Sequence, residues 1–191
     1  CCFIISKHII KQLKGVYIMI IFVRHGQTDC NINGIIQGHL DAPLNQTGIE
    51  QAEKTAEELK NTSIDIIYSS PLIRAKKTAE IINKYHSCPI ICDDNLKEQN
   101  AGDATGMCEK DITKEMFEEF CEDPHKFNAE SEEDLYNRTA IFFKSIENSN
   151  KNILVVAHRG NFKMLYRCIN KLSPNDKIES IGNAEVKTLK K

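Results

Sequence analysis

The sequence has no excess of charge of one sign. Its 191 residues include 25 Lys and Arg residues and 27 Asp and Glu residues, which gives a formal net charge of −2. Proteins that bind nucleic acid or a membrane surface normally carry a basic face. The balance of charge therefore argues against nucleic acid and against a membrane surface as partners.

The sequence also lacks the cysteine spacing of a zinc site. Eight cysteines are scattered through the chain, and no two of them form a Cys-x-x-Cys pair. A disulfide framework is the alternative use of so many cysteines, but such frameworks are typical of small secreted domains. We expect a cytoplasmic protein whose reduced cysteines serve as small core or surface residues.

Internal repeats, low-complexity tracts and a second domain-sized segment are absent as well, so the length is that of one domain with a substantial core. The apolar run from Cys1 to Ile5 is too short to span a bilayer, lysines interrupt the residues after it, and no small-residue cleavage site follows. We therefore expect no signal peptide.

Apolar runs with the composition of buried strands lie at residues 18–23, 64–68, 89–92 and 152–157. Helical patterns lie between them, at residues 47–60, 109–121 and 131–148. The first helical pattern opens with a capping box, Thr47-Gly-Ile-Glu50. Strands that alternate with helices predict an α/β fold, a three-layer α/β/α sandwich with a largely parallel central sheet.

Two histidines and two arginines follow the predicted strands closely. Arg24 and His25 come directly after the first run, His158 comes directly after the last, and Arg74 lies in the first turn of a helix that begins near Pro71. The carboxyl ends of parallel strands open onto the crevice that binds ligands in α/β proteins. The four side chains should therefore form a cationic pocket suited to a dianionic phosphoryl group.

Such a pocket predicts phosphoryl transfer. An unprotonated ring nitrogen of His25 held close to phosphorus would act as the nucleophile, while Arg24 and Arg74 would bind the oxygens and stabilise their charge. His158 would serve as a second positive or hydrogen-bonding group on those oxygens. A metal site on His25 and His158 is the alternative, and it is disfavoured because the neighbouring arginines would repel a cation.

Several separate motifs occur in a fixed order: Arg24-His25-Gly26-Gln27-Thr28, Asn31, Gln37-Gly38, Asp41-Ala-Pro-Leu44, Ser69-Ser-Pro-Leu-Ile-Arg74, Thr78-Ala-Glu80, Leu96-Lys-Glu98 and Val155-Val-Ala-His158-Arg-Gly160. In that order and spacing the chain resembles the histidine phosphatase superfamily, which includes the cofactor-dependent phosphoglycerate mutases. The likeness begins near Met19, where a member of the family would be expected to start. We therefore expect residues 1–18 to be an upstream extension and residues 19–191 to form a single histidine phosphatase domain.

The resemblance implies roles for particular residues. It assigns the general acid to Glu98, in the Leu-x-Glu segment that follows the second arginine. It implies no metal and no cofactor. It assigns the phosphate pocket to four residues, Arg24, His25, Arg74 and His158. It assigns further contacts with the phosphoryl group to Asn31, Gln37 and Gly38.

The chain departs from the family pattern at three places. The family commonly has Gly-x-Trp-Glu-Gly after the acid, whereas this chain reads Gly102-Asp-Ala-Thr-Gly106 and contains no tryptophan. Ala129 stands where the family's Gly-Glu-Ser segment has its glycine. Arg159 replaces the glycine that usually follows the second histidine, and we expect its side chain to face solvent rather than to add a cation at the pocket rim.

The segment between Glu98 and Glu130 favours a phosphatase. Mutases of this family carry a long basic insertion there, whereas this chain has a short segment that includes the acidic run at residues 117–123. We therefore expect a small cap near residues 100–130 and a metal-independent phosphomonoesterase that acts on a small phosphate ester through a phosphohistidine. A cofactor-dependent phosphoglycerate mutase is the alternative enzyme, and a non-catalytic domain that binds a phosphorylated ligand is a further alternative.

Overall fold

The computed structural model describes residues 19–174 and 176–190. The expected upstream extension, residues 1–18, lies outside them. A five-stranded sheet with the order β3-β2-β4-β1-β5 forms the centre of the described chain. Strand β5 pairs antiparallel with β1 and the other pairs are parallel, which confirms a largely parallel sheet. The strands are β1 (Met19–Arg24), β2 (Ile66–Ser69), β3 (Ile90–Cys92), β4 (Ile153–Ala157) and β5 (Val186–Lys190).

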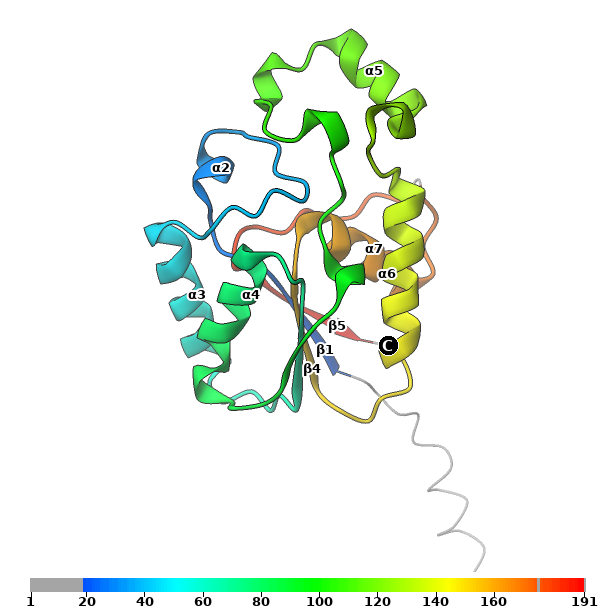
Figure 1. Ribbon diagram of the computed structural model, residues 1–191. Coiled ribbons are helices and arrows are strands. Elements are labelled where there is room, and N and C mark those ends of the chain that lie inside the picture. The colour runs from blue at the N-terminus through cyan, green and yellow to red at the C-terminus, as the bar shows by residue number, and fades with distance from the viewer. Residues whose placement is uncertain (1–18, 175, 191) are drawn as a thin grey trace, which may run out of the picture.

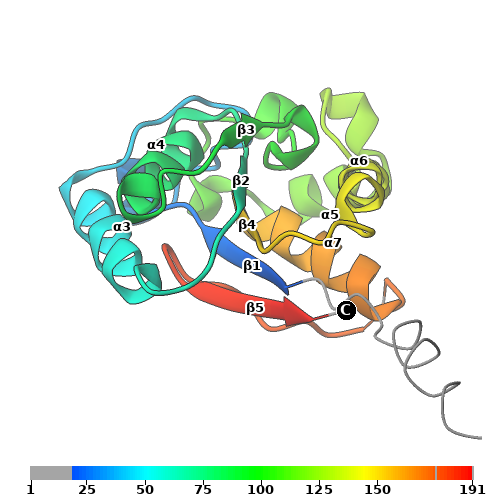
Figure 2. The same ribbon diagram turned by 90° about the horizontal axis from the view of Figure 1, so that it is seen from below.

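Helices cover both faces of the sheet (Figures 1 and 2), which confirms the predicted three-layer sandwich. Helices α3 and α4 pack on one face and α6 and α7 on the other. None of the helices in the described part of the chain is both long and apolar enough to cross a membrane. The four covering helices are α3 (Gln46–Leu59), α4 (Ile73–Ile82), α6 (Glu132–Ile146) and α7 (Arg159–Asn170).

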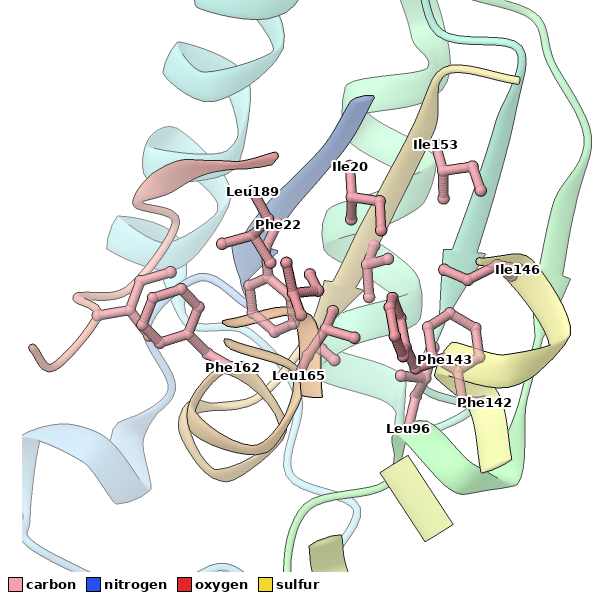
Figure 3. Close-up of a cluster of buried hydrophobic side chains, with 14 of the residues drawn as sticks. Ile20, Phe22, Leu96, Phe142, Phe143, Ile146, Ile153, Phe162, Leu165 and Leu189 are labelled. Atoms are coloured by element: carbon pink, nitrogen blue, oxygen red, sulfur yellow. The ribbon is translucent and has the colours of Figure 1, made fainter. Parts of the chain in front are cut away.

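The central strands are apolar without interruption because both of their faces are buried. In β1, Ile20 and Phe22 face the α6–α7 side, where Phe22 packs against Phe162 with ring centroids 5.4 Å apart (Figure 3). Ile21 and Val23 face α3 and α4. Alternate residues of one strand therefore supply two separate cores.

The parallel register of β1 and β4 positions the two predicted histidines. Arg24 pairs with Ala157, so His25 and His158 follow adjacent strands at the same edge of the sheet. Above that edge, at the top of Figure 1, lie a loop that contains the short helix α2 (Asp29–Ile32) and a segment that contains α5 (Lys114–Glu122). The chain therefore surrounds this edge with two long connections.

Several element boundaries differ from the sequence-based expectation. Asn45, not Thr47, caps α3, because its side chain accepts a hydrogen bond from the Gly48 amide at 2.8 Å. The helix expected over residues 109–121 is a 3₁₀ turn at Glu109–Asp111 followed by α5. By contrast, Ser131 caps α6 in a capping box with Asp134.

Candidate active site

His25 has one ring nitrogen occupied and one free. Its side chain is 2 % exposed, and Nδ1 lies 2.7 Å from the carbonyl oxygen of Gly26. Because a carbonyl only accepts hydrogen bonds, Nδ1 carries the proton and donates it, which leaves Nε2 unprotonated in the neutral ring. The arrangement therefore presents the lone pair of Nε2.

The surroundings of His25 keep its ring neutral. Burial lowers the pKa of His25 well below its ordinary value, and the positive charges of Arg74 and Arg24 lower it further. A neutral ring is the form that attacks an electrophile. The two arginines therefore act on the ring of His25 as well as on any anion bound beside it.

His158 packs against His25 with ring centroids 5.1 Å apart. It is fully buried, and its Nε2 lies 2.8 Å from Oγ of Ser70, whereas its Nδ1 is buried with no partner among the described residues. Burial lowers its pKa well below the ordinary value, and His25 and the arginines add to the effect. The structure thus brings the two histidines together as predicted, and it adds Ser70 as the partner of the second.

Arg74 is almost completely buried, at 1 % exposure, and its guanidinium donates to the carbonyls of Leu40 at 2.6 Å and Gly38 at 2.9 Å. Arg24 donates to the carbonyl of Ile181 at 3.1 Å. Burial lowers the pKa of both guanidinium groups. Within the described ranges neither arginine forms an ion pair, although burying an unpaired charge is costly. Both arginines are therefore prepared for an anion that would pair with them.

Glu98 is anchored against the start of α7. Its Oε1 accepts hydrogen bonds from the amides of Gln99 at 3.0 Å and Gly160 at 3.2 Å. A Cβ atom at position 160 would lie 2.5 Å from that oxygen, so only glycine allows the approach. The carboxylate raises the pKa of Arg24 and Arg74 through its charge, in opposition to burial. Glu98 therefore lies close to the pocket, where the sequence placed the acid.

Arg138 fixes the backbone that carries Glu98. It donates to both oxygens of Glu130, at 2.8 and 2.9 Å, and to the carbonyls of Asn95, Lys97 and Glu98 at 2.8, 2.6 and 2.9 Å. Burial opposes the charge on Glu130, but the hydrogen bonds from Arg138 and the Asn100 amide outweigh it and lower the pKa of Glu130. A mostly buried ion pair thus holds the loop at residues 95–98, called the acid loop below after the role that the sequence predicts for Glu98.

The three residues predicted to add phosphoryl contacts lie near one another. Oδ1 of Asn31 accepts from the Thr28 amide at 3.1 Å, and Oε1 of Gln37 accepts from the Thr28 hydroxyl at 3.1 Å. Gly38 has a positive φ of 46° and gives its carbonyl to Arg74. All three contribute to the wall of the same cavity.

Asn183 contacts two residues of this site, although no motif in the sequence predicts it. Its Nδ2 donates to the backbone carbonyl of His25 at 3.0 Å and to Oδ1 of Asn31 at 3.2 Å. The residue lies in the turn before β5, where no local motif marks it. It reaches His25 only because β5 pairs with β1.

A cavity of about 910 Å³ contains the site. Its wall includes Arg24, His25, Arg74 and Glu98, whereas His158, which is fully buried, does not contribute to the wall. The opposite part of the wall comes from residues 103–127, with Met107, Ile112, Met116, Phe117, Phe120 and Phe127 as its apolar members. This volume leaves room for an alcohol as well as a phosphoryl group.

Arg159 corrects one expectation. Its side chain is exposed, as expected, but it also forms part of the cavity wall, and after burial its charge is the main cause that lowers the pKa of Arg24. A cation therefore stands at the cavity where the family has glycine.

As for metals, the described residues contain no group of three or more His, Cys, Asp or Glu that could hold an ion.

Known proteins of similar sequence and structure include several phosphatases. The uncharacterized phosphatase PhoE of Bacillus subtilis is 44% identical over 138 residues, which are 71% of this chain and 69% of that protein. The metal-independent phosphoserine phosphatase of Arabidopsis thaliana is 32% identical over 170 residues, or 83% of this chain and 71% of that protein. The mycobacterial glucosyl-3-phosphoglycerate phosphatase complexed with VO3 superposes with a TM-score of 0.78 at 27% identity and covers 89% of this chain and 90% of its own.

The family model for the histidine phosphatase superfamily, branch 1, matches residues 20–190. This range takes in all of β2 to β5, β1 from Ile20 onward and every residue of the cavity described above. The chain therefore belongs to branch 1 of the histidine phosphatase superfamily.

Proposed function

We propose that this chain is a metal-independent phosphomonoesterase that acts on a small phosphorylated metabolite through a phosphohistidine intermediate on His25. The hydrogen bond from Nδ1 of His25 to the Gly26 carbonyl carries the proposal, because it leaves Nε2 free at a cavity with two unpaired arginines. The names of the relatives support the same activity.

Arg24 and Arg74 bind the phosphoryl oxygens in this proposal. The Nε atoms of both arginines and Nδ1 of His158 are buried without a hydrogen-bond partner among the described residues. These atoms are enclosed by protein, so a bound anion would act on the two guanidinium groups through its negative charge, which offsets the cost of burying them. Further contacts come from the cavity residues Asn31, Gln37 and Gly38.

In the first step, Nε2 of His25 attacks phosphorus in line with the leaving alcohol. The P–N bond forms as the P–O bond breaks, and the alcohol oxygen takes the bonding electron pair together with a proton from Glu98. Charge on the equatorial oxygens is stabilised by Arg24 and Arg74. The alcohol then leaves.

In the second step, water attacks the phosphorus of the phosphohistidine. Glu98, now a carboxylate, accepts the proton of the water as the new P–O bond forms. The P–N bond breaks and returns its electron pair to Nε2 of His25. Inorganic phosphate leaves, and both residues regain their starting protonation states.

His158 acts through the ring of His25 in this proposal. A phosphoryl group bonded to His25 would lie next to a ring whose centroid is 5.1 Å from that of the nucleophile. Hydrogen bonding to Ser70 at 2.8 Å fixes the orientation of the His158 ring. Because His158 is fully buried and its Nε2 is bonded to Ser70, we assign it to positioning the ring of His25 rather than to nucleophilic attack.

Transfer to water is favoured over transfer between positions of phosphoglycerate. We treat residues 19–191 as one domain and residues 100–130 as its cap. This cap supplies mainly apolar and acidic residues to the cavity, among them Glu109 and Glu119, rather than the basic insertion of the mutases, and the cap cation Lys114 pairs with Glu118 at 3.3 Å. Carboxylates of the cap repel a phosphorylated product, so the cap does not close over it as the basic insertion of the mutases does.

The test is turnover of a panel of phosphomonoesters in the presence of a chelator, with phosphate release and isomerised product measured together. We expect phosphate release that disappears in the His25→Ala variant, and an acid-labile phosphoenzyme in the unaltered protein. Isomerisation of phosphoglycerate without net phosphate release would replace the proposal by the mutase. Inactivity across the panel, with phosphate still bound, would replace it by the non-catalytic binding domain.

A further inference from the structure

In the sequence, Arg159 lies between two residues of the site, His158 and Gly160. His158, before it, packs its ring against His25 with centroids 5.1 Å apart. Gly160, after it, donates its amide to Oε1 of Glu98 at 3.2 Å. Arg159 therefore lies between a residue that contacts His25 and a residue that contacts Glu98. Its side chain is exposed at the cavity wall.

Lys163 adds a second cation on the same helix. It lies four residues after Arg159 in α7, so the two side chains occupy one face of the helix. Lys163 is partly buried and also forms part of the cavity wall. Two positive charges one helical turn apart thus face the same space.

Neither of these cations is neutralised within the part of the chain that the structure describes. No ion pair or hydrogen bond joins Arg159 or Lys163 to a carboxylate there, whereas Glu132 on the same wall pairs with Arg167 at 3.4 Å. Repulsion from Arg159 also lowers the pKa of Arg24. An anion bound between these groups would relieve that repulsion.

The phosphoryl group does not account for these two cations. Arg24 and Arg74 already line the cavity beside His25, and the volume of about 910 Å³ extends well past one phosphoryl group. We propose that Arg159 and Lys163 form a second anion-binding subsite, which selects phosphate monoesters whose alcohol carries a further anionic group, a carboxylate or a second phosphate. This inference rests on the proposed phosphatase function and adds its substrate class.

Matched pairs of esters test the subsite. For a carboxylate, 3-phosphoglycerate is compared with glycerol 3-phosphate, and for a second phosphate, fructose 1,6-bisphosphate is compared with fructose 6-phosphate. We expect Arg159→Gln to lower kcat/KM for one or both of the doubly anionic esters about tenfold or more, mainly through KM, as for loss of a charged hydrogen bond. The singly phosphorylated neutral alcohols should change less than about twofold.

Three further variants complete the comparison. Arg159→Lys should restore most of the preference, because it keeps the charge, and Lys163→Gln should reduce it several-fold. The matched control is Lys76→Gln, since Lys76 is exposed on α4 and lies outside the cavity wall. An equal loss with all four esters would overturn the subsite and assign Arg159 to the phosphoryl group. No change with any ester would overturn it in favour of a solvated side chain.

Binding separates the failure of this inference from failure of the proposed function. Calorimetry on His25→Ala, with and without Arg159→Gln, measures affinity for the same esters without turnover. If the unaltered protein hydrolyses no ester but Arg159 still favours the doubly anionic ones, the subsite stands and the phosphatase does not. If the neutral esters are hydrolysed through His25 and Arg159 makes no difference to binding, only the subsite fails.

Discussion

The amide of Gly160, the second residue of α7, donates a hydrogen bond to Oε1 of Glu98 at 3.2 Å. A Cβ atom at this position would lie 2.5 Å from the same oxygen and 2.9 Å from Cδ2 of Leu135. Gly160→Ala should therefore displace the carboxylate. Since a misplacement near 1 Å can cost about a hundredfold in rate, we expect kcat to fall by about that factor.

The leaving group shows whether the displaced group is the acid. Nitrophenolate leaves without needing a proton, so Gly160→Ala and Glu98→Gln should both slow nitrophenyl phosphate far less than an alkyl phosphate. Steady-state kinetics with both esters is the measurement. Equal losses on the two esters would show that Gly160 acts on something other than proton transfer.

Arg138 should contribute to the stability of the folded protein. Arg138→Ala removes a mostly buried ion pair with Glu130 and three hydrogen bonds to the acid loop, which should lower the free energy of unfolding by about 3 kcal/mol. Urea denaturation measures the change. The matched control is Lys77→Ala, which breaks an exposed pair with Glu80 and should cost about 0.5 kcal/mol or less. A similar small change for Arg138→Ala would contradict the role of this pair.

The pH dependence of activity should reflect the neutral ring of His25. Its pKa lies well below the ordinary value, so the unprotonated nucleophile persists as the pH falls through 6.5. We expect the acid limb of the kcat/KM profile below that pH, and NMR resonances of His25 that do not titrate between pH 7.5 and 6.5. Titration of His25 at its ordinary pKa would refute the description of the site.

Burial of His25 and His158 should make the stability of the folded state sensitive to acid. The unfolded chain protonates His25 and His158 near pH 6.5, whereas the folded chain protonates them only at lower pH. The unfolded state therefore binds more protons as the pH falls, and the stability present above pH 6.5 is lost below it, by up to about 1.4 kcal/mol per histidine per pH unit.

Urea denaturation at pH 7.5, 6.5 and 5.5 measures this loss. Inorganic phosphate should offset part of it, because an anion beside the rings favours their charged forms. His25→Asn should reduce the slope of stability against pH. A free energy of unfolding that stays constant over this range would contradict the lowered pKa values.

Some of this structure follows from local pattern and some does not. The runs that form β1 and β4 are apolar throughout because helices cover both faces, so their positions and the meeting of His25 with His158 were predictable. The cap of α3 was assigned wrongly, because Asn45 and Thr47 are both good capping residues and only the path of the chain decides between them.

Other features depend on contacts between distant parts of the chain. Strand β5 has only Val186 and Leu189 as apolar residues, and pairing with β1 rather than its own pattern defines it as a strand. Asn183 enters the site because the turn before β5 returns to His25. The orientation of Arg159 follows from the way α7 starts between two site residues.

The pairing of β1 with both β4 and β5 also sets when the site can exist. Arg24 bonds the carbonyl of Ile181, 157 positions later in the sequence, and His25 bonds Asn183 at a similar separation. Contacts between residues so far apart in the sequence form slowly, because closing the long loop between them costs conformational entropy. During synthesis His25 is therefore made well before Asn183, and its pocket is complete only after β5 has left the ribosome, so catalytic competence reports folding of all five strands of the described sheet.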